Sequence, residues 1–268
     1  MRARIGGGGV VVTIRSAHGV VLLAALFILV PAHALLLPSS ARGHVAADPA
    51  DAVLKDIGVD EKLGAALPPD LVFNDQDGKP VRLGDLFAGK PAILTLNYYT
   101  CPMLCPVTLR NLLTALEGIR GLRPERDYRV VTVSIDPSER PEAARARAGE
   151  IHGMMRGVPD RREAWRFLIG QPAEVGALTR AVGFRYKKVG AGFAHPDVNV
   201  VVTPDGKISR YLYGVAQDPA DLKLALIEAA GGRIGQSTAI NRILLYCYRY
   251  DPVGKRYALY AKNIMKAG

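Results

Sequence analysis

The feature that most constrains this chain is a predicted strand that runs directly into two cysteines and then into a predicted helix. Residues 92–99 are strand formers with no turn signal among them, which predicts a buried strand. Leucines recur at helical spacing over residues 109–116. The segment between these two patterns, residues 100–106, reads TCPMLCP. Any fold of this chain therefore carries both thiols in one strand-to-helix loop.

Strand and helix patterns alternate along most of the sequence. Besides the first strand and helix, they predict a hairpin at 71–83, a strand at 128–135, a helix at 141–155, a strand at 165–169, a helix at 172–182, paired strands at 198–202 and 208–213, and a helix at 219–230. Strands that alternate with helices and close in an antiparallel hairpin predict an α/β fold. We expect a thioredoxin-like fold, with a mixed central sheet flanked by helices.

Four regions are expected along the chain. Residues 1–47 form a targeting or anchor segment, and residues 48–70 form a linker with one short amphipathic helix. Residues 71–232 form the thioredoxin-like domain, and residues 233–268 form a C-terminal extension. A length of 268 residues suits one such core with appendages better than two full domains.

The N-terminal segment has the pattern of a secretory signal. Three arginines precede an apolar run at residues 20–30, and no acidic residue occurs before Asp48. Cleavage after residue 34 or after residue 47 is compatible with this pattern. An uncleaved anchor is an equal alternative, because residues 19–37 approach the ~20 residues that span a bilayer. Both interpretations predict an extracytoplasmic, periplasm-facing protein that is secreted across or anchored in the inner membrane.

The formal net charge of the chain is +10. Four of its 35 Lys and Arg residues, and none of its 25 acidic residues, lie in residues 1–47, so the remainder carries +6. No interleaved runs of aromatic and basic residues accompany this charge, so nucleic-acid binding is not expected. The charge either faces an acidic protein or anionic lipid headgroups, or belongs to ordinary solvated side chains.

The position of the two cysteines predicts thiolate chemistry. Proline is tolerated only in the first turn of a helix, so we expect Pro106 at the first helical position and Cys105 as the capping residue. The positive end of the helix dipole lowers the pKa of a thiol, which favours metal binding or attack on a disulfide.

The spacing of the cysteines bears on the choice between these reactions. Three residues separate Cys101 from Cys105, against two in the common redox motif. A disulfide across the loop remains open. Two soft sulfurs, however, suit Cu(I) or zinc, and thiolate with imidazole suits copper in either oxidation state.

A metal held by these thiols needs a third ligand. The candidate histidines are His44, His152 and His195. His195 precedes the predicted strand at 198–202, and in a thioredoxin-like sheet its loop lies beside the cysteine loop. A single loop histidine is also commonly just a solvated side chain, so the residues alone leave both interpretations open.

Several segments together resemble the SCO/SenC copper proteins. They are LTLNYYTCPMLCP at 94–106, VTVSIDP at 131–137, His195, TPDGK at 203–207 and RYLYG at 210–214. The resemblance runs from about Leu71 to Ala230 with its elements in order. The segment LLYCYRYDP at 244–252 resembles an extension seen in a bacterial branch of the family. One departure is Pro196-Asp197, where many members continue from the histidine directly into a hydrophobic strand.

The resemblance implies a protein that binds one copper ion, as Cu(I) or Cu(II), through Cys101, Cys105 and His195. It implies a part in assembling the dinuclear copper centre of cytochrome c oxidase, by delivering copper, by reducing the partner's cysteines, or both. The implied partners are subunit II or another copper acceptor, together with other copper chaperones. Membrane association would come from the N-terminal segment.

Three further residues have two interpretations each. Asp136 either orients a metal ligand without binding the metal itself or caps a helix before Pro137. Met103 either offers a thioether to copper or packs in the loop. Cys247 is either a buried, inert cysteine or a third redox thiol.

Three functions compete for the cysteine loop. The first is a copper chaperone, not a turnover enzyme, that holds Cu(I) on two thiolates and neutral His195 and releases it by ligand exchange. The second is an extracytoplasmic thiol-disulfide reductase or redox sensor that uses Cys101 and Cys105 without His195. The third is a peroxidase of the peroxiredoxin type, which is disfavoured because no proline lies between Ala92 and Cys101.

Overall fold

Residues 56–235 and 246–247 are described by the computed structural model. The predicted targeting segment and nearly all of the predicted C-terminal extension lie outside this part of the chain. Among the helices of the described part, none combines the length and the apolar character needed to cross a bilayer.

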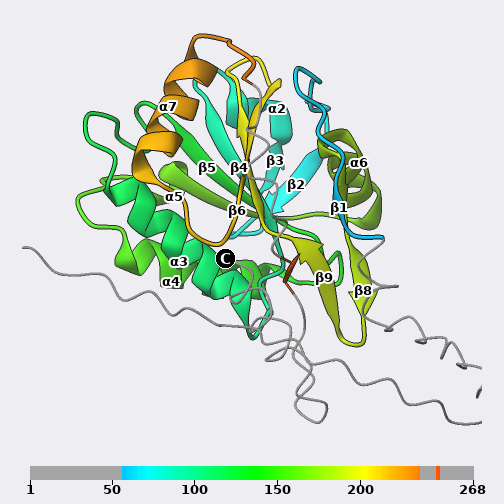
Figure 1. Ribbon diagram of the computed structural model, residues 1–268. Helices are drawn as coiled ribbons and strands as arrows, with labels where there is room; N and C mark the ends of the chain where they lie inside the picture. The colour runs from blue at the N-terminus through cyan, green and yellow to red at the C-terminus, as the bar shows by residue number, and fades with distance from the viewer. Residues whose placement is uncertain (1–55, 236–245, 248–268) are drawn as a thin grey trace, which may run out of the picture. The chain divides into compact units, whose positions relative to one another are not determined.

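A seven-stranded sheet forms the centre of the fold (Figure 1). In spatial order its strands are β11 (Ile208–Tyr213), β10 (Val198–Val202), β4 (Ala92–Asn97), β5 (Arg129–Ser134), β6 (Trp165–Ile169), β2 (Val72–Asp75) and β3 (Pro80–Arg82). The middle strands β4, β5 and β6 run parallel, and the pairings outside them are antiparallel. This topology confirms the predicted mixed sheet.

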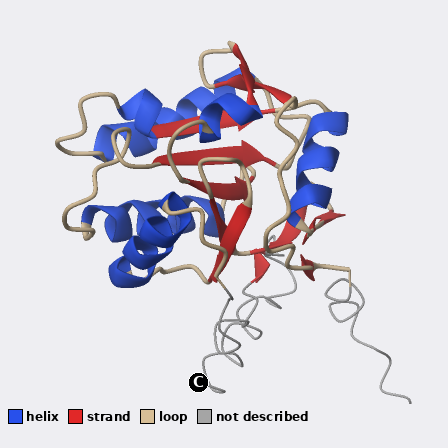
Figure 2. Cartoon of the chain, turned by 90° about the horizontal axis from the view of Figure 1, so that it is seen from above, coloured by secondary structure: helices blue, strands red, loops and turns tan. Residues whose placement is uncertain are grey.

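Helices cover both faces of this sheet (Figure 2). They are α2 (Leu83–Phe87), α3 (Leu104–Glu117), α4 (Pro141–Met154), α5 (Arg161–Ala164), α6 (Pro172–Val182) and α7 (Pro219–Ala230). Neighbouring strand residues point to opposite faces, so each strand contributes to two apolar layers. Ile93 and Phe167 pack with α3, α4 and α7 on one face, whereas Leu94 and Leu168 pack with α2 and α6 on the other.

Two smaller sheets lie beside the central one. They consist of β1 (Gly58–Val59) with β7 (Phe184–Arg185), and of β12 (Tyr246–Cys247), β9 (Gly192–Pro196) and β8 (Lys187–Val189) in that order. His195 therefore lies in a strand and not in the loop that we expected. The reason is its pairing with residues distant in sequence, which local patterns do not reveal.

Residues 56–70 contain no helix, and the first part of the predicted linker, residues 48–55, lies outside the described residues, so the short helix expected in the linker stays a prediction. β1 pairs instead with β7, and Ala66 forms an isolated bridge with Lys207. Ile57 and Leu67 are buried. The burial of two widely spaced apolar side chains thus fixes this segment in extended form along the domain.

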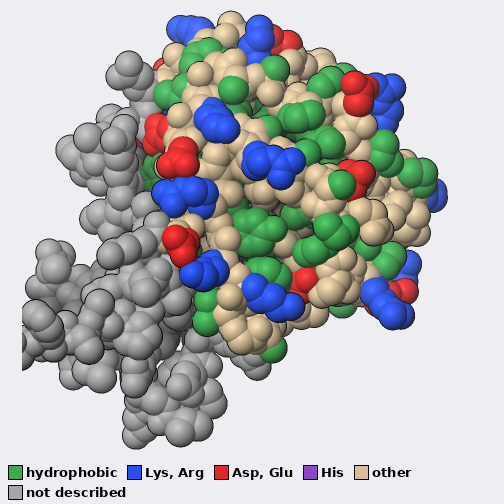
Figure 3. Space-filling view, turned by 90° about the vertical axis from the view of Figure 1, so that its right-hand side faces the viewer, with side chains coloured by type: hydrophobic (Ala, Val, Ile, Leu, Met, Phe, Trp, Pro, Cys, Tyr) green, Lys and Arg blue, Asp and Glu red, His purple; other side chains and the backbone are tan. Residues whose placement is uncertain are grey.

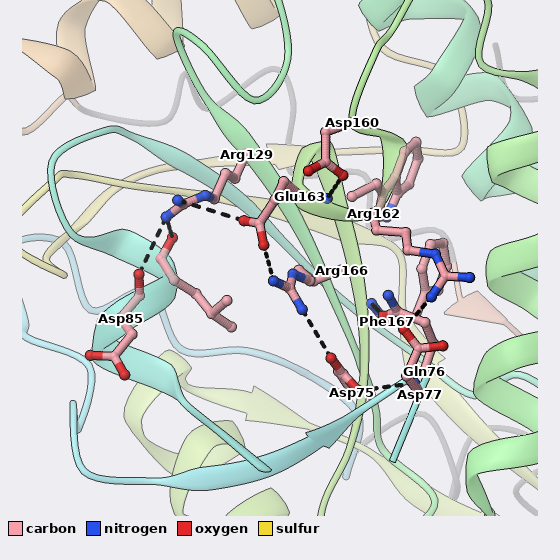
Figure 4. A network of polar contacts seen from close by, with 12 residues as sticks. Asp75, Gln76, Asp77, Asp85, Arg129, Asp160, Arg162, Glu163, Arg166 and Phe167 are labelled. Atoms are coloured by element: carbon pink, nitrogen blue, oxygen red, sulfur yellow. Dashed lines mark hydrogen bonds and ion pairs between the residues drawn. The ribbon is translucent and has the colours of Figure 1, made fainter. Parts of the chain in front are cut away.

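A partly buried ion-pair network joins the turn of the first hairpin to β6 (Figure 4). Asp75, at the end of β2, is only 2% exposed. Its Oδ1 accepts two backbone N–H groups of the turn at 2.9 Å, and its Oδ2 accepts from Arg166 at 2.9 Å. Arg166 also pairs with Glu163, which lies 3.8 Å from Arg129. The network thus holds the edge hairpin on the sheet.

Candidate metal centre

The sheet topology brings together residues that are far apart in the sequence. β4 ends at Asn97, and the chain then forms the cysteine loop. β10 pairs antiparallel with β4, so the residues just before β10 lie beside the residues just after β4. The resulting contact joins Cys105 to His195, 90 positions later. The structure thereby unites the loop and the histidine as predicted.

The helix after the cysteine loop begins earlier than we predicted. α3 starts at Leu104 with Met103 as its N-cap residue, so Cys105 is second and Pro106 third in the helix. N–H groups throughout the first turn have no intrahelical acceptor, so proline is tolerated at any of these positions. The position of Pro106 therefore limits the start of the helix only to within one turn.

Cys105 and His195 are in direct contact. Cys105 Sγ and His195 Nε2 lie 3.5 Å apart. The other ring nitrogen, Nδ1, lies 3.0 Å from the carbonyl oxygen of Pro196, which can only accept a hydrogen bond. In the neutral ring Nδ1 therefore carries the proton, and the lone pair of Nε2 faces Cys105 Sγ. Both side chains are buried, each being 1% exposed.

Cys101 is a free, buried thiol beside Cys105. The hydrogen bond to Cys105 raises the pKa of Cys101 far above its ordinary value, and burial and the charge of Cys105 add to this rise. The backbone N–H groups of Cys105 and Met103 oppose it. The prediction of a lowered thiol pKa is therefore wrong for Cys101. Burial and the neighbouring sulfur of Cys105 raise the pKa by more than the helix N-terminus lowers it.

Aromatic side chains enclose the imidazole. Tyr98 meets His195 edge-on with ring centroids 6.0 Å apart, and Phe184 lies at 6.1 Å. Burial raises the pKa of Tyr98, as does its hydrogen bond to Cys101, so this side chain stays a neutral phenol. The rings keep water from the sulfurs and the imidazole, which strengthens every electrostatic interaction between them.

A buried carboxylate, Asp197, adjoins the site and was not among our candidates. Its Oδ2 accepts a hydrogen bond from the Thr108 hydroxyl of α3 at 3.0 Å. Burial raises the pKa of Asp197 to about 6, although the charge of His195 and the hydrogen bond from Thr108 both lower it. Burial alone lowers the pKa of His195, but Cys105, the Pro196 carbonyl and Asp197 together raise it. The one sequence signal for Asp197 was the departure from the family pattern at this position.

Two other candidate residues are engaged elsewhere. The Oδ1 of Asp136 accepts from the backbone N–H of Ser138 at 2.9 Å and from its hydroxyl at 2.6 Å, which closes a turn after β5. The role of orienting a metal ligand without binding the metal itself stays a prediction for Asp136. His152, on α4, has its Nε2 atom 2.8 Å from the carbonyl oxygen of Trp165.

Glu139, which we did not predict, holds the start of the cysteine loop. Its carboxylate accepts the backbone N–H groups of Tyr99 at 2.9 Å and Thr100 at 2.6 Å, and the hydroxyl of Ser134 at 2.6 Å. These bonds fix the backbone immediately before Cys101. An acidic residue in a turn is too common for the sequence alone to single it out.

Within residues 56–235, no three His, Cys, Asp or Glu side chains are grouped closely enough to hold a metal ion. The structure instead contains two contacting pairs, Cys105 with His195 and Cys101 with Cys105. An ion bound tetrahedrally, at about 2.3 Å to sulfur and about 2.0 Å to nitrogen, separates those two atoms by about 3.5 Å. The observed Sγ–Nε2 distance of 3.5 Å has this value. Two sulfurs and an imidazole are also donors that copper accepts, so the residues fit a copper ion.

Known proteins share this fold. The family model described as SCO1/SenC matches residues 60–229. A crystal structure of a protein from Aquifex aeolicus VF5 is 29% identical, with a TM-score of 0.57, over 63% of this chain and 95% of that one. Arabidopsis thaliana ScoI with copper bound is 22% identical, with a TM-score of 0.50, over 64% of this chain and 99% of that one.

A third similar structure is that of BsSco, a member of the Sco family of cytochrome c oxidase assembly proteins in which a disulfide switch has been identified. It is 22% identical, with a TM-score of 0.50, over 64% of this chain and 97% of that one. These neighbours confirm the predicted thioredoxin-like fold. Because the family model matches well over half of its residues, the chain belongs to the SCO1/SenC family.

Proposed function

We propose that this chain is a copper chaperone that binds one copper ion through Cys101, Cys105 and His195 and delivers it in assembly of the dinuclear copper centre of cytochrome c oxidase. Copper binding and assembly of cytochrome c oxidase are the known functions of the SCO1/SenC family. The observation that carries the proposal is the 3.5 Å contact between Cys105 Sγ and His195 Nε2. Histidines that ligate metals usually donate their other ring N–H to a carbonyl or carboxylate, as His195 does to Pro196.

Loading of the site requires a proton to leave. Cys101 keeps its proton while it bonds to Cys105, and the thiolate is the form that binds metal. Copper therefore replaces this proton, and binding releases it to solvent. The neutral tautomer of His195, with its proton on Nδ1, is the form that offers the Nε2 lone pair to the ion.

Release of the ion depends on access to the cysteine loop. Thr100 and Pro102 are exposed on either side of Cys101, and Met103 is partly exposed. An acceptor can approach along this part of the loop and exchange its own thiolates and imidazoles for those of the site. A set of three ligands leaves a coordination position open for the first incoming group.

The described surface suits a protein partner. Figure 3 shows Lys and Arg side chains interspersed with Asp, Glu and apolar side chains on one face. This mixture of signs differs from the continuous basic stripe of a nucleic-acid site. We place the acceptor, cytochrome c oxidase subunit II or another copper protein, and the chaperones that supply copper, outside the cytoplasm. The N-terminal segment would export or anchor the chain there.

A second candidate function is reduction of disulfides by the same cysteines. The hydrogen bond between Cys101 and Cys105, which form no disulfide here, favours it, because it places the two sulfurs next to each other. The pair would pass two electrons and two protons to a disulfide of the acceptor and become a Cys101–Cys105 disulfide. This reaction needs neither copper nor His195.

Replacement of His195 separates the two functions. We expect the reduced wild-type chain to retain one copper per molecule after desalting. In His195→Ala, affinity for Cu(I), measured against a competing chelator, should fall by at least about 100-fold, the upper range for loss of a supporting group. The rate at which the chain reduces a small disulfide should change little.

His152→Ala is the matched control, because His152 bonds to the Trp165 carbonyl and not to a cysteine. This variant should keep its copper. A wild-type chain that retains no copper but reduces disulfides quickly would show that the reductase is the function.

A further inference from the structure

The backbone that precedes Cys101 is held by two residues of opposite charge. Glu139 lies between β5 and α4, and its carboxylate accepts the backbone N–H groups of Tyr99 and Thr100. The Nη2 atom of Arg147, on α4, donates a hydrogen bond to the carbonyl oxygen of Tyr99 at 2.7 Å. An anion and a cation thus bind the donors and the acceptor of one short stretch of backbone.

These bonds satisfy polar groups that the sheet no longer pairs. β4 ends at Asn97, so Tyr99 and Thr100 lie beyond the strand. Tyr99 is only 3% exposed, and a buried backbone group without a partner is costly. The Tyr99 hydroxyl in addition lies 2.7 Å from the carbonyl oxygen of Leu168. Tyr99 is therefore fixed through its backbone and its side chain, two positions before Cys101.

The two charged residues are themselves held in place. The Glu139 carboxylate also accepts the Ser134 hydroxyl at 2.6 Å. The Arg147 side chain is 13% exposed and pairs with Glu150, which pairs in turn with Arg110 of α3 at 2.6 Å. Groups that position a site act precisely only when other contacts restrain them. The ion pairs therefore connect the start of the cysteine loop to α3, the helix that carries the second cysteine.

We propose that Glu139 and Arg147 are positioning residues that hold Cys101 beside Cys105 before copper binds. The inference rests on the proposed function of the site. Cys105 lies in α3 and contacts His195, whereas Cys101 lies in neither a helix nor a strand. The place of its thiol therefore depends on the backbone just before it. A ligand that is already in place loses less conformational freedom when the ion binds, which raises the affinity.

Glu139→Gln and Arg147→Met test this assignment. Glutamine keeps the length of the side chain but replaces one acceptor oxygen by an amide donor, and methionine removes the guanidinium while keeping an apolar stem. In each variant, Cu(I) affinity against a competing chelator should fall by at least about 10-fold, the lower range for loss of a supporting group. Glu142→Gln and Arg145→Met are the matched controls, because both side chains are exposed on α4, and both should bind copper as wild type does.

Alkylation of the copper-free full chain with iodoacetamide separates positioning from a general loss of stability. Cys101 and Cys105 are both buried, so unfolding exposes both thiols, whereas release of the loop start exposes Cys101 alone. We expect at least about 10-fold faster alkylation of Cys101 in Glu139→Gln and Arg147→Met, because local opening becomes more frequent. The rate at Cys105 should change little, as mass spectrometry of the two sites can show.

The outcomes of these measurements are distinct. Unchanged Cu(I) affinity in Glu139→Gln and Arg147→Met, with wild type keeping its copper, overturns the inference and leaves the proposed function intact. Equal acceleration of alkylation at both cysteines also overturns it, because it shows a general destabilisation. A wild-type chain that retains no copper overturns the proposed function and this inference together.

Discussion

Serine in place of Cys105 is expected to abolish copper retention, and serine in place of Cys101 is expected to weaken it less. Cys105 Sγ contacts His195 Nε2 at 3.5 Å and also accepts the hydrogen bond of Cys101. Its loss therefore separates the other two ligands, whereas loss of Cys101 leaves the Cys105–His195 pair in place. We expect Cu(I) affinity to fall by more than about 100-fold in Cys105→Ser, beyond the range for loss of an outer partner.

A competition titration of both variants with a Cu(I) chelator measures this difference. Serine is close to cysteine in size, so both variants should unfold at nearly the same urea concentration as wild type. Equal losses of affinity in the two variants would show that Cys105 is not the central ligand.

Alanine in place of Asp75 should give the largest loss of stability. The carboxylate is 2% exposed and accepts bonds from Arg166 and from two backbone N–H groups. Its removal takes one of two carboxylate partners from Arg166, which keeps Glu163, and leaves two turn N–H groups without their acceptor. Loss of hydrogen-bond acceptors at such a buried site costs about 1–3 kcal/mol. The free energy of unfolding of the full chain, from a urea titration, measures it.

Asp70→Ala is the matched control for this prediction. Asp70 pairs with Arg82, but the side chains are 83% and 58% exposed. Exposed pairs contribute less than about 1 kcal/mol, so the variant should unfold almost as wild type does. Similar losses in Asp70→Ala and Asp75→Ala would mean that the network of Figure 4 does not stabilise the hairpin.

The regular elements of the domain could be predicted from sequence because their ends carry local signals. α6 and α7 each begin at a proline and are followed by glycine. β10 and β11 flank a Pro-Asp-Gly turn. In each case the residue that ends the element has a backbone preference of its own, which no distant contact has to supply.

The short strands could not be predicted in this way. β1 and β7 have two residues each and pair with one another across a long stretch of sequence. β9 forms a hairpin with β8, but its His195 has as register partner Cys247 of β12, far along the chain. His195 therefore looked like a loop residue. The start of α3 was also misplaced, since proline fits anywhere in a first turn.

The site was only partly visible in the sequence. Spacing singled out Cys101 and Cys105, and the family resemblance added His195. The raised pKa of Cys101 depends on the second sulfur and on burial, which the sequence does not show. Asp197 and Glu139 escaped notice because their roles depend on Thr108 and on the N–H groups of Tyr99 and Thr100.

X-ray absorption spectroscopy of the copper-loaded full chain tests the central claim most directly. We predict at least two sulfur neighbours at about 2.3 Å and one histidine nitrogen at about 2.0 Å from the ion. The histidine signal should disappear in His195→Ala. A spectrum with nitrogen and oxygen neighbours only, or one that His195→Ala leaves unchanged, would contradict a copper site built from Cys101, Cys105 and His195.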